Sequence, residues 1–258
     1  HNAEKGYEGR IYTKWDVFHI HHLPPPIIQE SSLCINLTTA ALKTTDNWAT
    51  VSKSYQRDLI EHSMFSTLLA AFPHSFACSN GLKEKERLAI LHKLSPTLDH
   101  GEVKARLQER YFGQSDPSIP VFGFVGRICE QKGVELLGWV MKDLIIRLNG
   151  RIQFLIGGFA PPGDPYATRC ASILQQLKSE FPKSVWADPD KFFTDGGFVN
   201  LGCDFGTVPS KYEPSGVVQQ EFFLAGTPVI AFKTGGLKDT VFEGQGTPNN
   251  GFTFESHT

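Results

Sequence analysis

The sequence predicts an α/β protein whose C-terminal part forms a doubly wound parallel sheet. Three observations support this. From about residue 118 onward, short apolar runs alternate with helical segments, and glycine-rich loops follow several of these runs. The composition, 40% hydrophobic and 20% charged over 258 residues, suits one or two domains that each bury a core. Such alternation implies right-handed βαβ units.

The expected strands are short apolar runs, as buried parallel strands require. They are VFGFV at 121–125, IQFLI at 152–156, then 184–186, 205–208, PVIAF at 228–232, and 251–254. Helices are expected at 133–148, 166–180 and 217–224, the last after Pro214, which is a helix start signal. The charged stretch before Pro120 predicts a junction, with a mostly helical N-terminal domain at 1–117 and a C-terminal domain at 118–258.

Charge and cysteine usage exclude several classes of function. A formal charge of −2 with scattered Lys and Arg argues against a nucleic-acid partner, and no apolar run approaches the length of a membrane span. Five widely spaced cysteines indicate a reduced, intracellular protein. His19, His21 and His22 have no Cys or carboxylate at a suitable spacing, so no metal site is expected.

Residues 212–241 carry the strongest signal for an anion-binding site. Glu213 and Glu221 stand eight apart on either side of a predicted helix start. The first backbone N–H groups of a helix lack internal partners and attract phosphate. We therefore expect a phosphate at the amides of Ser215, Gly216 and Val217. The next strand delivers Thr234, Gly235 and Gly236 to the same edge of the sheet, where ligands bind in such folds.

Two further loops carry suitable chemistry. Arg127 and Lys132 lie on one strand-to-helix loop and suit a diphosphate, Arg as a planar fork and Lys as a point charge. The loop GGFAPPGDP follows another strand, and its Gly158 would let a ligand approach the backbone.

Five segments in this order closely resemble the C-terminal half of the glycogen and starch synthases, a family of retaining GT-B glycosyltransferases. They are GRICEQKG, GGFAPPGDP, CDFGTVPSKYEPSGVVQQE, GTPVIAFKTGGLKDTV and GFTF. Glu213 and Glu221 match the E-x7-E pattern of retaining GT-B enzymes. More weakly, HNAEKGYEGR resembles the family's HN segment and Asn80-Gly81 its NG pair.

The resemblance implies a GT-B fold with a Rossmann-like C-terminal domain and only part of the N-terminal domain. The family's glycine-rich lysine motif is expected before His1, so the chain is expected to be a partial one that binds nucleoside diphosphates weakly and turns over slowly or not at all. The implied reaction transfers glucose with retention from ADP-glucose or UDP-glucose to the non-reducing end of an α-1,4-glucan, without a metal.

The resemblance also implies residue roles. Arg127 and Lys132 would stabilise the leaving diphosphate, and Glu213 would contact the glucosyl ring. The resemblance places Glu221 at the nucleotide ribose. Asn80 would hold the donor sugar or phosphate, and His1 would bind the sugar or support the reacting centre.

Other interpretations stay open. The chain could be a non-catalytic nucleotide- or glucan-binding fragment, a related α-glucan synthase domain with α-1,3 linkage, or a retaining GT-B transferase with another acceptor. Glu213 could serve only as a helix N-cap partner, and Glu221 could be a solvent-exposed glutamate. The expected location is the cytoplasm, or a plastid in a starch-making cell, and the sequence does not indicate an oligomeric state.

Overall fold

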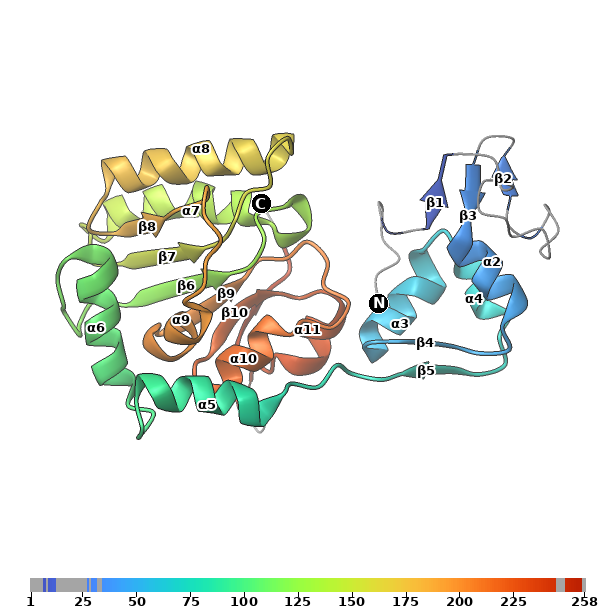
Figure 1. Cartoon of the computed structure of the whole chain (residues 1–258), viewed down its shortest axis with the longest axis horizontal. Coiled ribbons are helices and arrows are strands. Elements are labelled where there is room, and N and C mark those ends of the chain that lie inside the picture. The colour runs from blue at the N-terminus through green and yellow to red at the C-terminus, as the bar shows by residue number, and fades with distance from the viewer. Residues whose placement is uncertain are drawn as a thin grey trace. The chain divides into compact units, whose positions relative to one another are not determined.

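The computed structural model describes residues 7, 9–12, 27, 29–31, 34–244 and 249–256. Contacts between residues divide the chain into two compact units, His1–Ser79 and Asn80–Thr258. Figure 1 shows the elements of both units.

In the first unit, short strands accompany a small group of helices. β3 (Cys34–Asn36) pairs antiparallel with β1 (Arg10–Ile11) and β2 (Gln29–Ser31), and β4 (Trp48–Thr50) pairs parallel with β5 (Ser75–Ala77). The helices are α2 (Leu37–Thr44), α3 (Lys53–His62) and α4 (Ser66–Ala70). Asn36 and Ser52 cap α2 and α3 by accepting the amides of Thr39 and Tyr55. The core cluster is Trp48, Val51, Tyr55, Leu59, Phe65 and Leu69.

The second unit contains a six-stranded parallel sheet in the order β11-β10-β9-β6-β7-β8. Its elements in chain order are α5 (Glu84–Leu94), α6 (His100–Phe112), β6 (Val121–Val125), the 3-10 helix η2 (Glu130–Lys132), α7 (Val134–Arg147), β7 (Gln153–Gly157), α8 (Pro165–Glu180), β8 (Val185–Ala187), α9 (Gly196–Gly202), β9 (Phe205–Val208), α10 (Val218–Leu224), β10 (Val229–Phe232), α11 (Gly235–Thr240) and β11 (Gly251–Phe254). The chain winds from β6 toward β8, then returns to β9 and winds the other way. This confirms the predicted doubly wound sheet.

Helices cover both faces of this sheet (Figure 1). α7 and α8 pack on one face around buried residues such as Phe124, Met141 and Ile156. α9, α10 and α11 cover the other face, where Leu155 and Phe222 belong to a second core cluster. Successive residues of a strand point to opposite faces, so Leu155 and Ile156 enter different clusters. The sheet is therefore buried on both sides, which explains its nearly continuous apolar strands.

The boundary between the two compact units falls after Ser79, whereas the sequence predicted a domain junction after residue 117. α5 and α6 belong to the second unit, and α6 packs against α9. Val103 and Leu107, one turn apart on α6, are fully buried in the cluster that includes Val121. The charged residues around them obscure this apolar stripe in the sequence. The assignment of 1–117 and 118–258 to two functional domains stays a proposal.

A partly buried polar cluster joins α6 to the amino end of the sheet. Lys104 donates to Asp204 and to the Pro117 carbonyl, and the Val121 amide also donates to Asp204. His100 contacts the Leu201 carbonyl at 2.8 Å and the Asp204 carboxylate at 3.3 Å. The hydrogen bond with Asp204 raises the pKa of His100, against the effect of burial. Burial pushes the pKa of Asp204 up, but its hydrogen bonds with His100 and Lys104 outweigh burial and lower it.

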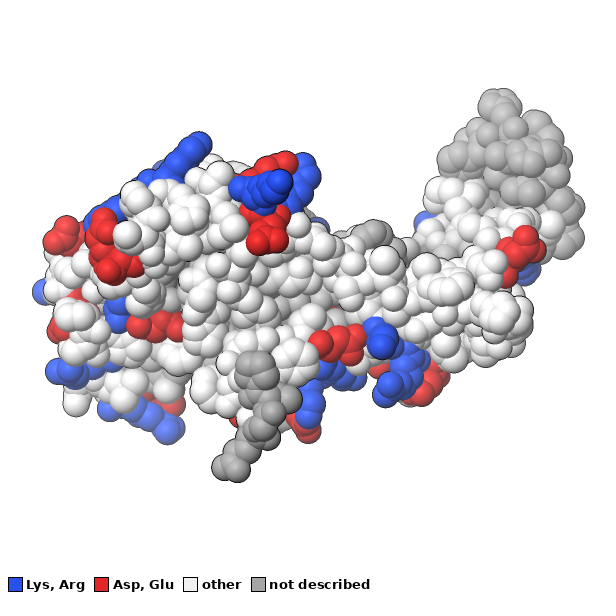
Figure 2. All heavy atoms as spheres, turned by 90° about the horizontal axis from the view of Figure 1, so that it is seen from below, with Lys and Arg blue, Asp and Glu red and all other residues white. Residues whose placement is uncertain are grey.

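Basic and acidic side chains lie intermixed on the face of the second unit shown in Figure 2. Among the described residues, no helix combines the length and the hydropathy that a membrane crossing requires.

Candidate active site

The site lies where the winding of the sheet reverses. β6 and β9 are neighbours, and each continues the chain in an opposite direction across the sheet. A crevice forms at the carboxyl ends of strands at such a reversal, and ligands bind there in open α/β sheets. The loop after β6 carries Arg127 and Lys132, and the loop after β9 carries Glu213. The two strongest sequence signals therefore meet at one point.

Backbone contacts hold these two loops together. The Lys211 amide donates to the Gln131 carbonyl at 2.9 Å, and the Gln131 side chain donates to the Tyr212 carbonyl at 3.3 Å. Gly133 directly follows Lys132 and adopts a φ of 62°. A Cβ on Gly133 would collide with the Pro209 carbonyl of the other loop. Only glycine fits this close approach, so Gly133 fixes the position of Lys132.

Lys132 and Glu213 form an ion pair between the two loops. Lys132 Nζ lies 2.5 Å from Glu213 Oε2, and their side chains are 19% and 9% exposed. The buried Ser210 hydroxyl donates to the same carboxylate oxygen at 3.1 Å. A charged pair with so little exposure interacts more strongly than a surface pair. A Lys ammonium has three donors, so two remain for an anion beside Glu213.

Hydrogen bonds from Gln219 of α10 hold the loop after Glu213 in place and link it to α11. Gly216 adopts a φ of 72°, and Gln219, fully buried, donates to the carbonyls of Ser215 and Gly216 and to Thr240 Oγ1. Gln219 therefore joins the turn to α11. These hydrogen bonds fix the path of the backbone at the start of α10. The helix begins at Val218, one residue after the predicted start at residue 217.

The glycines that precede α11 press against the loop of Glu213. The Gly236 amide donates to the Glu213 carbonyl at 2.8 Å. A Cβ on Gly235 would collide with that carbonyl, and a Cβ on Gly236 would collide with the Ser215 backbone. Contact with the protein's own backbone thus accounts for both glycines, and Thr234 leads into them as the N-cap of α11. Their predicted contact with a donor stays a proposal.

Gly158 has a similar role beside Arg127. A Cβ on Gly158 would lie 2.7 Å from the Gly126 carbonyl and 2.9 Å from Ile128 Cγ1. The amide of Ile128 donates to the Phe159 carbonyl, so the loops after β6 and β7 are joined. Arg127 lies on the exposed side of this junction.

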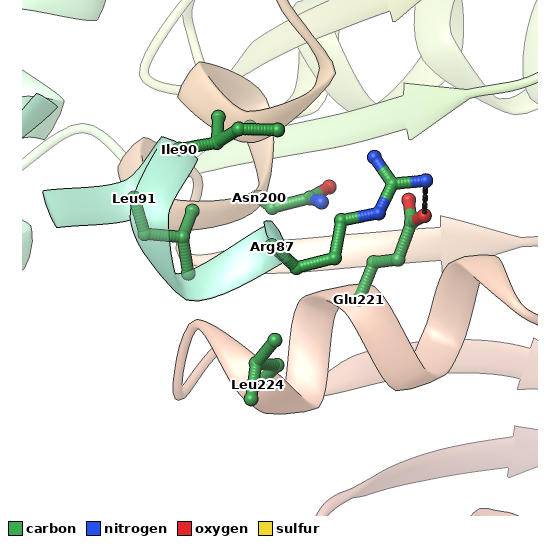
Figure 3. A pocket seen from close by; sticks show the side chains of 7 residues that line it. Arg87, Ile90, Leu91, Asn200, Glu221 and Leu224 are labelled. Atoms are coloured by element: carbon green, nitrogen blue, oxygen red, sulfur yellow. Dashed lines mark ion pairs between the residues drawn. The ribbon is translucent and has the colours of Figure 1, made fainter. Parts of the chain in front are cut away.

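Glu221 is half-buried and contacts α5, the first helix of the second unit. Arg87 Nη2 lies 2.6 Å from Glu221 Oε1, and the Glu221 side chain is 15% exposed (Figure 3). Its neighbour Gln220 donates to the carbonyls of Asn80 and Gly216 at 3.3 Å. Asn80 and Glu221 were both expected at the donor. Gln220 of α10 holds Asn80, and Arg87 of α5 holds Glu221.

The predictions for the histidines near the start of the chain and for a metal site remain to be compared with the structure. His1 and the histidines at 19, 21 and 22 lie outside the described residues. Within the described ranges, no group of three or more His, Cys, Asp or Glu residues could hold a metal ion.

Three residues that shape the site, Ser210, Gln219 and Arg87, were not predicted from the sequence. Ser210 stands three residues before Glu213, a spacing that allows a local hydrogen bond, and Gln219 lies in a polar QQE run on an otherwise apolar helix. Arg87 had no local signal, because its partner is distant in the sequence.

Residues 108–258 match the family of glycosyl transferases group 1. The match covers more than half of the chain and includes every site residue from Arg127 to Gly236. The chain belongs to the glycosyl transferases group 1. This confirms the family that the motifs indicated.

Curated relatives of this chain include glycogen and starch synthases. Glycogen synthase 2 of Nitrosococcus oceani is 36% identical over 142 residues, which are 54% of this chain and 27% of that protein. Glycogen synthase of Finegoldia magna is 29% identical over 257 residues, 90% of this chain and 51% of that protein. The chain thus spans about half the length, or less, of these relatives.

Two solved structures share the fold. The catalytic domain of starch synthase IV from Arabidopsis thaliana, bound to ADP and acarbose, matches with a TM-score of 0.70 and 22% identity over 91% of this chain and 50% of that one. Anabaena HepE, in complex with UDP and glucose, matches with a TM-score of 0.60 and 20% identity over 84% of this chain and 51% of that one. The predicted GT-B fold is confirmed.

Proposed function

We propose that this chain carries the donor site of a glucosyltransferase that moves glucose, with retention, from ADP-glucose or UDP-glucose to the non-reducing end of an α-1,4-glucan. The observation that supports the proposal most is the Lys132–Glu213 pair at the reversal point of the sheet. It brings a cation for a diphosphate and a carboxylate for a sugar to one place.

The difficult step is departure of the nucleoside diphosphate, because negative charge grows on the leaving phosphate. Lys132 and Arg127 would stabilise that charge, and the amides of Ser215, Gly216 and Val217 would add donors. Because loops that are joined through their backbones hold Lys132 in place, little reorganisation is needed when the charge forms.

Glu213 would hydrogen-bond the glucosyl ring and favour its oxocarbenium-like transition state. Both of the hydrogen bonds described for its carboxylate involve Oε2, and Oε1 takes part in neither. Lys132 would then contact both Glu213 and the diphosphate, which would couple sugar position to phosphate position. We assign no protein nucleophile.

The remaining donor contacts would come from residues near the Lys132–Glu213 pair and on α10. Glu221 would bind the ribose, Asn80 the sugar or phosphate, and Gly158, Thr234, Gly235 and Gly236 would border the donor. The ligands of the two structural neighbours, ADP in one and UDP in the other, support a nucleoside diphosphate here and leave both bases as candidates.

A chimera tests the reaction. Residues 80–258 replace the matching part of the Finegoldia magna glycogen synthase, and transfer of labelled glucose from ADP-glucose or UDP-glucose to a maltooligosaccharide is measured. We expect new α-1,4 linkages, with the anomeric configuration read by NMR, and loss of transfer in Glu213→Gln. A chimera that binds the nucleotide but transfers no glucose would support the binding-only alternative, and a different linkage would support the related α-glucan synthases.

A further inference from the structure

The first turn of α5 reaches α10 through a salt bridge that the proposed chemistry does not use. Arg87 Nη2 lies 2.6 Å from Glu221 Oε1. In Figure 3 the Arg87 side chain extends from α5 toward Glu221 on α10. The Glu221 side chain is 15% exposed and the Arg87 side chain is 48% exposed, so Arg87 is the member of the pair nearer to solvent.

Apolar residues line one side of this ion pair. The pocket around it is lined by Arg87, Ile90 and Leu91 of α5, Gly197 and Asn200 of α9, and Glu221 and Leu224 of α10. A Cβ on Gly197 would lie 2.8 Å from Ile90 Cγ2, so α5 packs closely on α9. The attraction within a half-buried pair is stronger than that of a pair in open water. Arg87 therefore determines where the Glu221 carboxylate points.

Arg87 is part of a wider attachment between α10 and the segment before α5. Gln220, next to Glu221, donates to the Asn80 carbonyl and to the Gly216 carbonyl. Residues 80–87 are thus held at two points on the helix that begins after Gly216. Gln220 therefore links the segment before α5 to the loop that carries Glu213.

The positive charge of Arg87 also offsets the negative charge of Glu221. Glu213 and Glu221 are two carboxylates beside a proposed diphosphate site, and like charges repel. Lys132 offsets Glu213, and Arg87 offsets Glu221. An unpaired Glu221 would repel the diphosphate as well as lose its orientation.

We propose that Arg87 is a positioning residue for nucleotide recognition. It holds the Glu221 carboxylate toward the ribose hydroxyls of the donor and cancels its repulsion of the diphosphate. This inference rests on the proposed function, which places a nucleoside diphosphate at Glu221.

Binding of nucleotides that lack one ribose hydroxyl tests the inference. Dissociation constants of ADP, 2′-deoxy-ADP and 3′-deoxy-ADP, and of the matching uridine series, are measured for the full chain and for Arg87→Ala. In the wild type we expect at least one deoxy form to bind about three- to tenfold more weakly, the worth of a hydrogen bond. In Arg87→Ala this discrimination should disappear.

Three variants serve as controls. Lys83→Ala removes the same charge from an exposed residue just before α5, whose partner is Glu86, and should keep the discrimination. Glu221→Gln should remove it, and adding Arg87→Ala to Glu221→Gln should cause no further loss. Arg87→Lys, which keeps the charge without the planar fork, should recover part of the affinity but less of the discrimination. Thermal unfolding confirms that each variant is folded.

The outcomes separate the two proposals. If the wild type discriminates and folded Arg87→Ala discriminates equally, Arg87 does not position Glu221 and the inference is wrong. If the wild type binds nucleoside diphosphates without discriminating the deoxy forms, Glu221 does not read the ribose, and the inference fails while the diphosphate site stands. If the wild type binds no nucleoside diphosphate, the proposed function and the inference both fail.

Discussion

At the scale of single residues, the partner of each charge decides what the charge can do. Lys132 is 19% exposed and paired with Glu213, whereas Lys211, on the neighbouring loop, is 42% exposed and paired with the exposed Glu130. Surface pairs such as the second contribute little. The two lysines therefore make a matched comparison of a site cation with a nearby surface cation.

Lys132→Ala should weaken binding of ADP or UDP by about 1.5–3 kcal/mol, roughly ten- to a hundredfold, because one charge-assisted hydrogen bond to the diphosphate is lost. Lys211→Ala should change the affinity by less than about threefold, since its ammonium serves a surface pair. Calorimetric titration measures both. Equal affinities for Lys132→Ala and the wild type would remove Lys132 from the diphosphate site.

His100 gives a pH-dependent contribution to stability. Its pKa in the folded chain is raised, chiefly by the hydrogen bond with Asp204, above the usual value of about 6.5. Its stabilisation is thus complete below that value and is lost as the pH rises through the folded pKa. Asp204 has a lowered pKa, so its contribution acts in the opposite direction and is lost as the pH falls through its folded value.

The melting temperature of the wild type should therefore exceed that of His100→Gln most below about pH 6, and the difference should shrink toward pH 9. Thermal unfolding of both proteins over this range checks the sign. A difference that grows with pH would mean that protonated His100 does not stabilise the fold.

At the scale of elements, close contacts between loops shape the site. A Cβ on Gly236 would lie 2.5 Å from Ser215 Cα, well inside van der Waals contact. Gly101, on the exposed side of α6, has no neighbour closer than 3.4 Å. Helix α11 can therefore approach the loop of Glu213 only with glycine at its start.

Gly236→Ala should lower the free energy of unfolding by about 1–3 kcal/mol, because the added methyl group forces the two loops apart. Gly101→Ala should leave it unchanged or raise it by up to about 1 kcal/mol, since alanine favours a helix. Urea unfolding of each variant gives the comparison. Full stability in Gly236→Ala would show that the loops have room to move.

Local pattern predicted the sheet well and the helices of the second unit in part. The strands at 121–125, 205–208 and 251–254 have the predicted bounds, and β7 (Gln153–Gly157) and β8 (Val185–Ala187) begin one residue later than predicted. The short strands of the first unit were not predicted, because two or three residues carry too little periodicity. α9 was not predicted either, since its GGFVNLG sequence begins with glycines that disfavour a helix.

The site was predictable where residues are close in the sequence. Glu213, Ser215 and Gly216 stand together in one motif, and the strand order brings Lys132 to them. Arg87 could not be found in this way, because its contact with Glu221 depends on how α5 packs against α9 and α10. The same holds for Gln219, whose partner Thr240 lies on another helix.

At the scale of the whole molecule, the donor-side residues with described positions all belong to the unit Asn80–Thr258. This unit contains the six-stranded sheet and the elements that hold Lys132, Glu213 and Glu221. We therefore predict that the chain binds a nucleoside diphosphate on its own, although it spans about half the length of its curated relatives.

Calorimetric titration of the full chain with ADP and with UDP, and with AMP and UMP as controls for the second phosphate, tests this claim most directly. We predict saturable binding of at least one diphosphate, with the matching monophosphate at least tenfold weaker because it lacks the phosphate that Lys132 and Arg127 would hold. No binding of either diphosphate, or equal binding of the monophosphates, would contradict a diphosphate site at the reversal point of the sheet.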